Sequence, residues 1–190
     1  MPRVEILVEE KSIKELLRII LPKVLPQKWQ LDENYFIREH EGKSDLKKSI
    51  ENKVKVFSNW HEPIGLVVVH DQDTADCKLL KEMLVDKCKK GTCRFLVRII
   101  CRELESWYLG DMDAIEGAYP HFKASIYKNK AKFRNPDACN ACDELKKILP
   151  GFQTVSGAKK IAPYLSTENN RSNSFHMFME GVKIFFETFE

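Results

Sequence analysis

Four short apolar segments alternate with amphipathic segments in the first half of the chain, and this alternation most constrains the fold. The apolar segments are RVEILVE (3–9), NYFIREHEG (34–42), IGLVVVH (64–70) and RFLVRIIC (94–101). The first three are followed by apolar residues at the three- and four-residue spacing typical of a helix. Strands that alternate with helices over short connections predict an α/β fold: a mostly parallel sheet of about four strands, with helices on both faces.

The pattern changes near Asp111, after which the sequence is typical of helices and loops. We therefore expect an α/β core in residues 1–111 and a helical extension, 112–190, packed on it. The last helix should carry an apolar stripe that packs on the core, or that alternatively forms a partner interface. The residues of this stripe are Phe175, Phe178, Met179, Val182, Phe185, Phe186 and Phe189.

Local signals predict how two helices begin. Ser12 and Glu15 have the spacing of a capping box, which predicts that the first helix starts at Ser12. Glu10 and Glu105 are interpreted as solvated acids in the first turns of helices, where the helix dipole favours negative charge.

Acidic side chains follow three of the four predicted strands, at the point where each strand ends. Glu9 and Glu10 end the first strand, Asp71 and Asp73 follow the third, and Glu103 and Glu105 follow the fourth. Ligands of open α/β sheets bind at the carboxyl ends of strands, where the strand order reverses. If the first and third strands are neighbours, Glu9 and Asp71 should face each other. The alternative is that these acids serve turns, with Asp73 or Thr74 capping the next helix.

Clustered carboxylates repel one another unless a cation neutralises them. Mg²⁺ prefers oxygen ligands, and Mn²⁺ can substitute for it. We therefore expect Glu9, Asp71 and Asp73 to hold a metal ion. If the chemistry uses two metals, Asp76 or Glu103 would hold the second one.

Several sequence blocks resemble known families. VEE after the first strand and HDQD after the third resemble the TOPRIM domain of topoisomerases, DnaG-type primases and, more distantly, OLD-family nucleases. Together, VEILVEEKS, GKSDL, HDQDTADCKLLK and CRELESWYLGD more closely resemble an uncharacterised bacterial TOPRIM-like family, a domain of unknown function. Its members often stand beside an ABC-type ATPase in cassettes linked to phage defence. The resemblance covers essentially the whole chain.

The resemblance implies a TOPRIM/Rossmann-like sheet and Mg²⁺-dependent phosphodiester hydrolysis, as in a nuclease. Glu9 would be a metal ligand or general acid/base, Asp71 and Asp73 metal ligands, and Glu103 a further acid of the site. TOPRIM domains usually have Gly after the first Glu, whereas this chain has Glu10. Two alternatives stay open: a non-catalytic module that docks an ABC-type ATPase, and a phosphoesterase for small substrates.

Basic residues offer possible contacts to phosphate. Lys43, after the second strand, could contact a phosphate or could simply be solvated. The segment YKNKAKFR (127–134) interleaves basic and aromatic residues, a pattern of nucleic-acid binding as well as of a solvated face. Its basic residues are Lys128, Lys130, Lys132 and Arg134. The net charge of +3 is too small to decide between these readings.

Six cysteines without a secretory signal predict free thiols in a cytoplasmic protein, and no apolar run is long enough for a membrane span. Cys139 and Cys142 have metal-clip spacing, and Cys88 and Cys93 could complete a zinc site; the alternative is that they are small buried apolar residues. His70, before the acids, could hydrogen-bond to the site or be structural. The sequence leaves the oligomeric state open.

Overall fold

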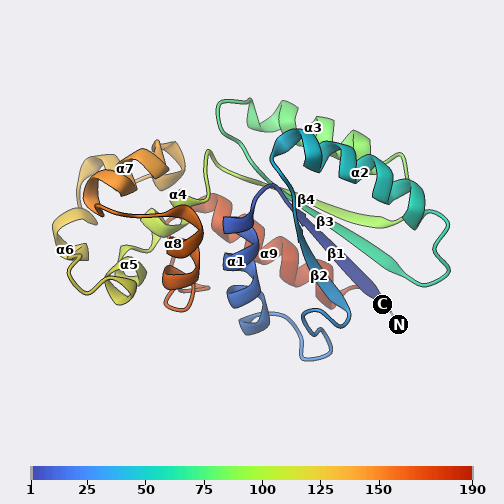
Figure 1. Ribbon diagram of the computed structural model, residues 1–190, viewed down its shortest axis with the longest axis horizontal. Coiled ribbons are helices and arrows are strands. Elements are labelled where there is room, and N and C mark those ends of the chain that lie inside the picture. Colours follow the sequence, from blue (N-terminus) through green and yellow to red (C-terminus); the bar gives the residue numbers. More distant parts are fainter. Residues whose placement is uncertain (1, 190) are drawn as a thin grey trace.

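The computed structural model describes residues 2–189, in which four parallel strands form one sheet (Figure 1). The strands are β1 (Arg3–Val8), β2 (Tyr35–Glu39), β3 (Ile64–Asp71) and β4 (Arg94–Ile100), in the order β2-β1-β3-β4. β3 is apolar and buried over almost its whole length, as expected of a strand that is covered on both faces. The predicted fold class is confirmed.

Helices cover both faces of the sheet. α2 (Lys43–Phe57) and α3 (Cys77–Cys88) lie on one face, and α1 (Lys11–Ile20) and α9 (Asn173–Glu187) on the other (Figure 1). Alternate residues of β1 supply the two cores: Ile6 packs on the side of α1 and α9, and Leu7 on the side of α2 and α3.

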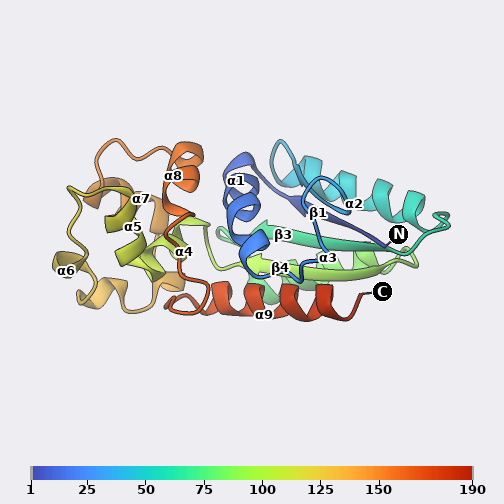
Figure 2. The same ribbon diagram turned by 90° about the horizontal axis from the view of Figure 1, so that it is seen from below.

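A lobe of short helices lies beyond the carboxyl ends of the strands (Figure 2). It contains α4 (Glu105–Gly110), α5 (Met112–Ala118), α6 (Ala124–Tyr127), α7 (Ala141–Ile148) and α8 (Thr154–Ile161). Short 3₁₀ turns occur at Leu21–Lys23, Ala131–Phe133 and Pro136–Ala138. The apolar residues of the lobe belong to the same core as those of α1 and α9, so the lobe and the sheet share one hydrophobic interior.

After the lobe, the chain returns along the sheet as α9, which ends beside the start of β4, where Arg94 Nη1 donates to the Thr188 carbonyl (2.7 Å) (Figure 2). The apolar stripe of this helix is buried, so its predicted packing on the core is confirmed. Gly65 of β3 permits the close approach, because a Cβ there would lie 2.9 Å from the Phe185 ring.

The predicted capping box of α1 is wrong. The helix begins at Lys11 with Glu10 as its N-cap residue, so Ser12 lies inside the first turn. The Ser12 hydroxyl donates to the Glu10 carboxylate instead of capping a backbone N–H. Glu10 therefore stands directly at the end of β1, beside Glu9.

The cap of α3 also differs from the prediction. Asp76 is the N-cap residue, and its Oδ1 accepts the backbone N–H groups of Lys78 and Leu79, both at 2.9 Å. Asp73 and Thr74 come too early, because the chain after β3 first hydrogen-bonds to backbone carbonyls at and beyond the end of β4.

The two longest helices, α2 and α9, have 15 residues each. Within residues 2–189, no helix is both long and apolar enough to cross a membrane.

Candidate functional site

β1 and β3 are neighbours at the point where the strand order reverses, since the chain goes from β1 to β2 on one side and from β3 to β4 on the other. Val8 pairs with Val69, so Glu9 and Asp71 leave the sheet at the same edge. The Asp71 backbone N–H donates to Glu9 Oε2 at 3.3 Å, across 62 positions of sequence. The two acids are therefore in contact, as expected if their strands are neighbours.

Glu9 is almost buried, with 8% of its surface exposed. Burial and the negative charge of Asp73 raise the pKa of Glu9 to about 7, although the Asp71 N–H works against the rise.

His70 contacts this glutamate on the side of α2 and α3. Its Nδ1 lies 2.5 Å from the Asp71 carbonyl oxygen and 3.0 Å from Glu9 Oε2. A carbonyl and a carboxylate oxygen both accept, so Nδ1 carries the ring proton. Burial lowers the pKa of His70, which favours the neutral ring. Of the two roles left open by the sequence, the structure gives His70 the contact with the acids.

Asp71 as a whole residue is less buried than Glu9, but one of its carboxyl oxygens is fully enclosed. Its Oδ1 is out of contact with solvent and has no hydrogen-bond partner within residues 2–189. Burial, followed by the charges of Glu9, Glu10 and Glu105, raises the pKa of Asp71 well above its ordinary value. A carboxyl oxygen in such a place carries a desolvation cost that nothing in the described chain repays.

Asp73 lies at the more open side of the group. Its backbone has a φ of +51°, and its N–H donates to the Arg102 carbonyl at 2.8 Å. Lys43 Nζ lies 2.5 Å from Asp73 Oδ2. This bond raises the pKa of Lys43, and the charges of Asp73, Glu9 and Asp71 add to the effect.

The start of α4 adds two side chains: Glu105, a strand-end acid interpreted from the sequence as solvated, and Tyr108, which was not predicted for the site. Glu105 is only 4% exposed, and burial raises its pKa to about 7, with the charge of Glu10 contributing. Tyr108 is fully buried, and its hydroxyl has no partner in the described part of the chain. Burial and the charges of Glu105, Glu10 and Asp71 raise the pKa of this hydroxyl. The interpretation of Glu105 as a solvated acid was wrong.

The two residues predicted for a second metal are engaged elsewhere. Asp76 Oδ1 caps α3. Glu103 Oε2 accepts the Cys142 N–H at 2.7 Å, in the first turn of α7. The structure thus brings Glu9, Asp71 and Asp73 together, and uses Asp76 and Glu103 at helix starts.

The basic segment 127–134 is partly structural. Lys128 pairs with Asp113 (3.2 Å), and Lys132 forms an ion pair with Glu144. Lys130 Nζ lies 4.6 Å from the centre of the Tyr127 ring. Phe133 is fully buried, whereas Arg134 is exposed.

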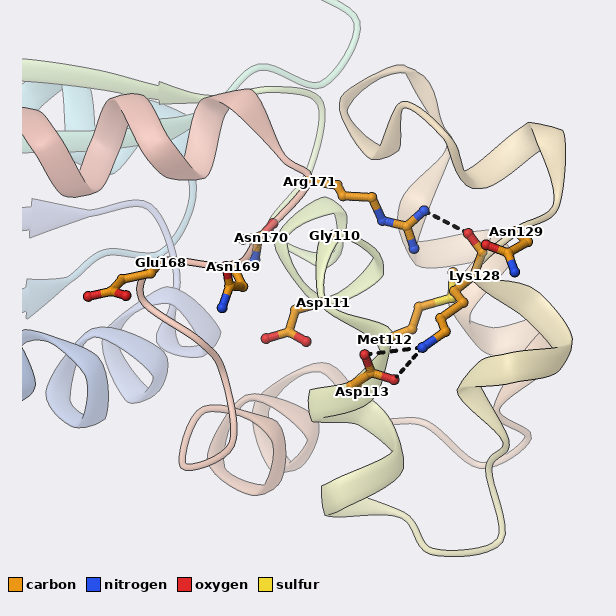
Figure 3. Close-up of a pocket in the computed structure, with 10 residues that line it drawn as sticks. All are labelled: Gly110, Asp111, Met112, Asp113, Lys128, Asn129, Glu168, Asn169, Asn170 and Arg171. Atoms are coloured by element: carbon orange, nitrogen blue, oxygen red, sulfur yellow. Dashed lines mark hydrogen bonds and ion pairs between the residues drawn. The ribbon is translucent and has the colours of Figure 1, made fainter.

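A polar pocket opens in the helical lobe (Figure 3). Its wall includes the Asp113–Lys128 ion pair, and Arg171 Nη1 donates to the Lys128 carbonyl at 2.6 Å. Asp111 also lines the pocket, and its carboxylate accepts the Ser166 N–H at 2.8 Å. The pocket lining, as far as residues 2–189 form it, includes none of the acids at the sheet edge, so the pocket is separate from them.

The cysteines do not form a common site. Cys88 and Cys93 pack in the core between the sheet and α2 and α3, while Cys139 packs against the opposite core. All six thiols are free. Across residues 2–189, no three His, Cys, Asp or Glu side chains are already arranged to hold a metal ion.

These features define a class: a parallel α/β protein with a buried acidic group at the reversal of its strand order, where such sheets bind their ligands. The chain belongs to the family described as domain of unknown function DUF4276, whose model matches residues 8–183. No curated protein and no solved structure matches the chain.

Proposed function

We propose that the protein hydrolyses phosphodiester bonds with Mg²⁺ at the carboxyl edge of β1 and β3. One observation carries the proposal: the Glu9 carboxylate accepts the backbone N–H of Asp71, 62 positions away, at 3.3 Å where the strand order reverses. Both carboxyl groups have raised pKa values because burial disfavours their charge. A chain gains nothing in stability from such an arrangement, whereas a cation site requires it.

The chemistry of these side chains suits a hard divalent cation, although no three His, Cys, Asp or Glu side chains of residues 2–189 are placed as a ligand set in the structure. The donors are all oxygens, and Asp71 Oδ1 is buried without a hydrogen-bond partner among the described residues. Glu9, Asp71 and Asp73 would hold Mg²⁺ or Mn²⁺. The bound ion would supply Lewis-acid activation of water and of the phosphoryl group.

The residues next to the three acids would orient the metal ligands and bind the substrate phosphate. His70 touches both the Asp71 carbonyl and Glu9 Oε2, and so fixes the direction of the Glu9 carboxylate. Lys43 stands half-exposed at the open side, where its ammonium would pair with a phosphate oxygen. Glu105 and Tyr108 close the site on the side of the lobe and keep it dry.

The TOPRIM resemblance supports a nuclease within this reaction class, and the strand order β2-β1-β3-β4 agrees with acids that meet after the first and third strands. A role in phage defence beside an ABC-type ATPase is part of the proposal and comes from the resemblance alone. A small phosphate ester is the competing substrate class.

Asp71→Asn tests the proposal, because it keeps the shape of the side chain and removes a charged ligand. We expect Mg²⁺-dependent cleavage to fall by on the order of 100-fold or more. Plasmid, single-stranded DNA, RNA and a panel of nucleotides and phosphate esters should be assayed with Mg²⁺, Mn²⁺ and EDTA. This panel also separates a nuclease from a small-substrate enzyme.

Asp113→Asn is the matched control, since Asp113 lies in the lobe and pairs with Lys128. It should retain wild-type activity. Circular dichroism establishes that both variants fold. Wild-type protein that binds no Mn²⁺ in calorimetry, and cleaves nothing in the panel, would leave the non-catalytic module as the better reading.

A further inference from the structure

Lys43 stands on a glycine turn that is tied to the acidic edge. Gly42, the N-cap residue of α2, has a φ of +88°, and its N–H donates to the Glu9 carbonyl at 3.2 Å. A Cβ added at Gly42 would meet nothing within 4 Å, so the turn is surrounded by open space. Lys43, the first residue of α2, therefore projects from a short turn anchored to the backbone of Glu9.

The ammonium of this lysine faces the three acids assigned to the metal. Its Nζ lies 2.5 Å from Asp73 Oδ2. The charges of Asp73, Glu9 and Asp71 all act on Lys43, and Lys43 in turn lowers the pKa of Glu9. Lys43 thus already holds a positive charge where the proposed function requires one.

We propose that Lys43 is the resident counter-ion of Glu9, Asp71 and Asp73, and that a divalent cation displaces it from Asp73. An ammonium 2.5 Å from Asp73 Oδ2 and a metal ion on the same oxygen exclude each other, because both are cations that need the same lone pairs. The displacement, though not the counter-ion role, rests on the proposed function.

Moving the Lys43 ammonium away from Asp73 costs little free energy. Half of the Lys43 side chain is exposed, and ion pairs of this kind are weak because water screens them. The ammonium is strongly hydrated and stands on a flexible four-carbon stem, so an outward position is readily populated. Once displaced, Lys43 is free to meet the phosphate of a bound ester.

Lys43→Met tests both parts, because it keeps the apolar stem and removes the charge. Lys48→Met is the matched control, since Lys48 is an exposed lysine of the same helix. After removal of metal with EDTA and dialysis, the Kd for Mn²⁺ is measured by calorimetry and by electron paramagnetic resonance. We expect Lys43→Met to bind Mn²⁺ roughly fivefold more tightly than wild type, and Lys48→Met to match wild type.

A second measurement needs no metal. In EDTA, Lys43→Met should lower Tm by about 2 °C, because the acids lose their counter-ion, and Lys48→Met should not. An unchanged Tm for Lys43→Met overturns the counter-ion role, and an unchanged or weaker Mn²⁺ affinity overturns the displacement. If no variant binds Mn²⁺ while the Tm shift is present, the counter-ion role stands and the failure belongs to the proposed function.

Discussion

β1 and its end carry two buried glutamates, Glu5 and Glu9, which the structure treats in opposite ways. Glu5 is only 1% exposed and is surrounded by cations. Arg3 Nη2, Arg38 Nε and Lys53 Nζ lie 2.5, 3.1 and 3.3 Å from its carboxylate oxygens. Glu9, four residues later, lies among Asp71, Asp73 and other acids.

The pKa values of Glu5 and Glu9 are shifted in opposite directions. Burial alone would raise the pKa of Glu5, but the hydrogen bonds from Arg38 and Arg3 and the charge of Lys53 hold it below its ordinary value. At Glu9 burial prevails, and the pKa rises to about 7.

The contrast teaches that this chain can neutralise a buried carboxylate when only stability is at stake. It does so at Glu5 with residues from β1, β2 and α2. It does so only in part at the carboxyl edge, where Lys43 pairs with Asp73 while burial and neighbouring acids raise the pKa values of Glu9, Asp71 and Glu105. The edge therefore keeps a costly arrangement, as functional sites do.

Removal of Glu5 gives the first test of the comparison between Glu5 and Glu9. Glu5→Ala should lower the free energy of unfolding by about 3 kcal/mol, since it leaves its cations without their shared partner. Urea denaturation at pH 7 measures the loss. Glu39→Ala is the control, because Glu39 pairs with Lys14 at 2.5 Å on the surface and should change little. A loss at Glu5 as small as that at Glu39 would remove the distinction between the two ends of β1.

Stability should respond to pH in opposite directions at the two ends. A carboxyl group with a raised folded pKa binds more protons in the folded state, so its contribution falls as pH rises from its unfolded pKa to its folded one. Glu9 and Glu105, both with a pKa of about 7 instead of 4.5, should each make the metal-free protein less stable at pH 8 than at pH 5.5 by about 2 kcal/mol.

The double variant Glu9→Gln/Glu105→Gln isolates this effect. It should gain stability over wild type at pH 8 and lose most of that gain at pH 5.5, as followed by urea denaturation in EDTA. The lowered pKa of His70 works in the opposite direction below its ordinary value of 6.5, so the difference between variant and wild type is the informative quantity. A difference that is constant with pH would show that the two acids are neutralised after all.

The sequence was sufficient for the sheet and for the meeting of Glu9 with Asp71. The period of the apolar residues predicts strands and helices, and the shared exit edge of parallel strands then brings the acids together. The sequence did not predict the burial of Glu105, because that residue is buried by the packing of α4 inside the lobe. No local pattern describes that packing. The apolar run SWYLG directly after Glu105 was the available signal.

Contacts between distant residues account for the other differences. Asp76 rather than Asp73 caps α3, because the chain after β3 stays hydrogen-bonded to the segment at the end of β4. The partners of Glu5 in β2 and α2 are 33 and 48 positions away, so its neutralisation could not be predicted from local spacing.

Arg38→Gln has the smallest expected effect, and it tests whether the cations around Glu5 stabilise the fold independently or as a unit. Arg38 is 46% exposed, and Arg3 and Lys53 would remain beside Glu5 after Arg38→Gln. The loss at pH 7 should be only about 0.5 kcal/mol. Because the pKa of Glu5 is lowered in the folded state, this loss should vanish as pH falls through that pKa and Glu5 becomes protonated. A loss as large as that of Glu5→Ala would mean that the three cations stabilise Glu5 only as a unit. Glu5 would then be no more securely neutralised than the acids at the other end of its strand.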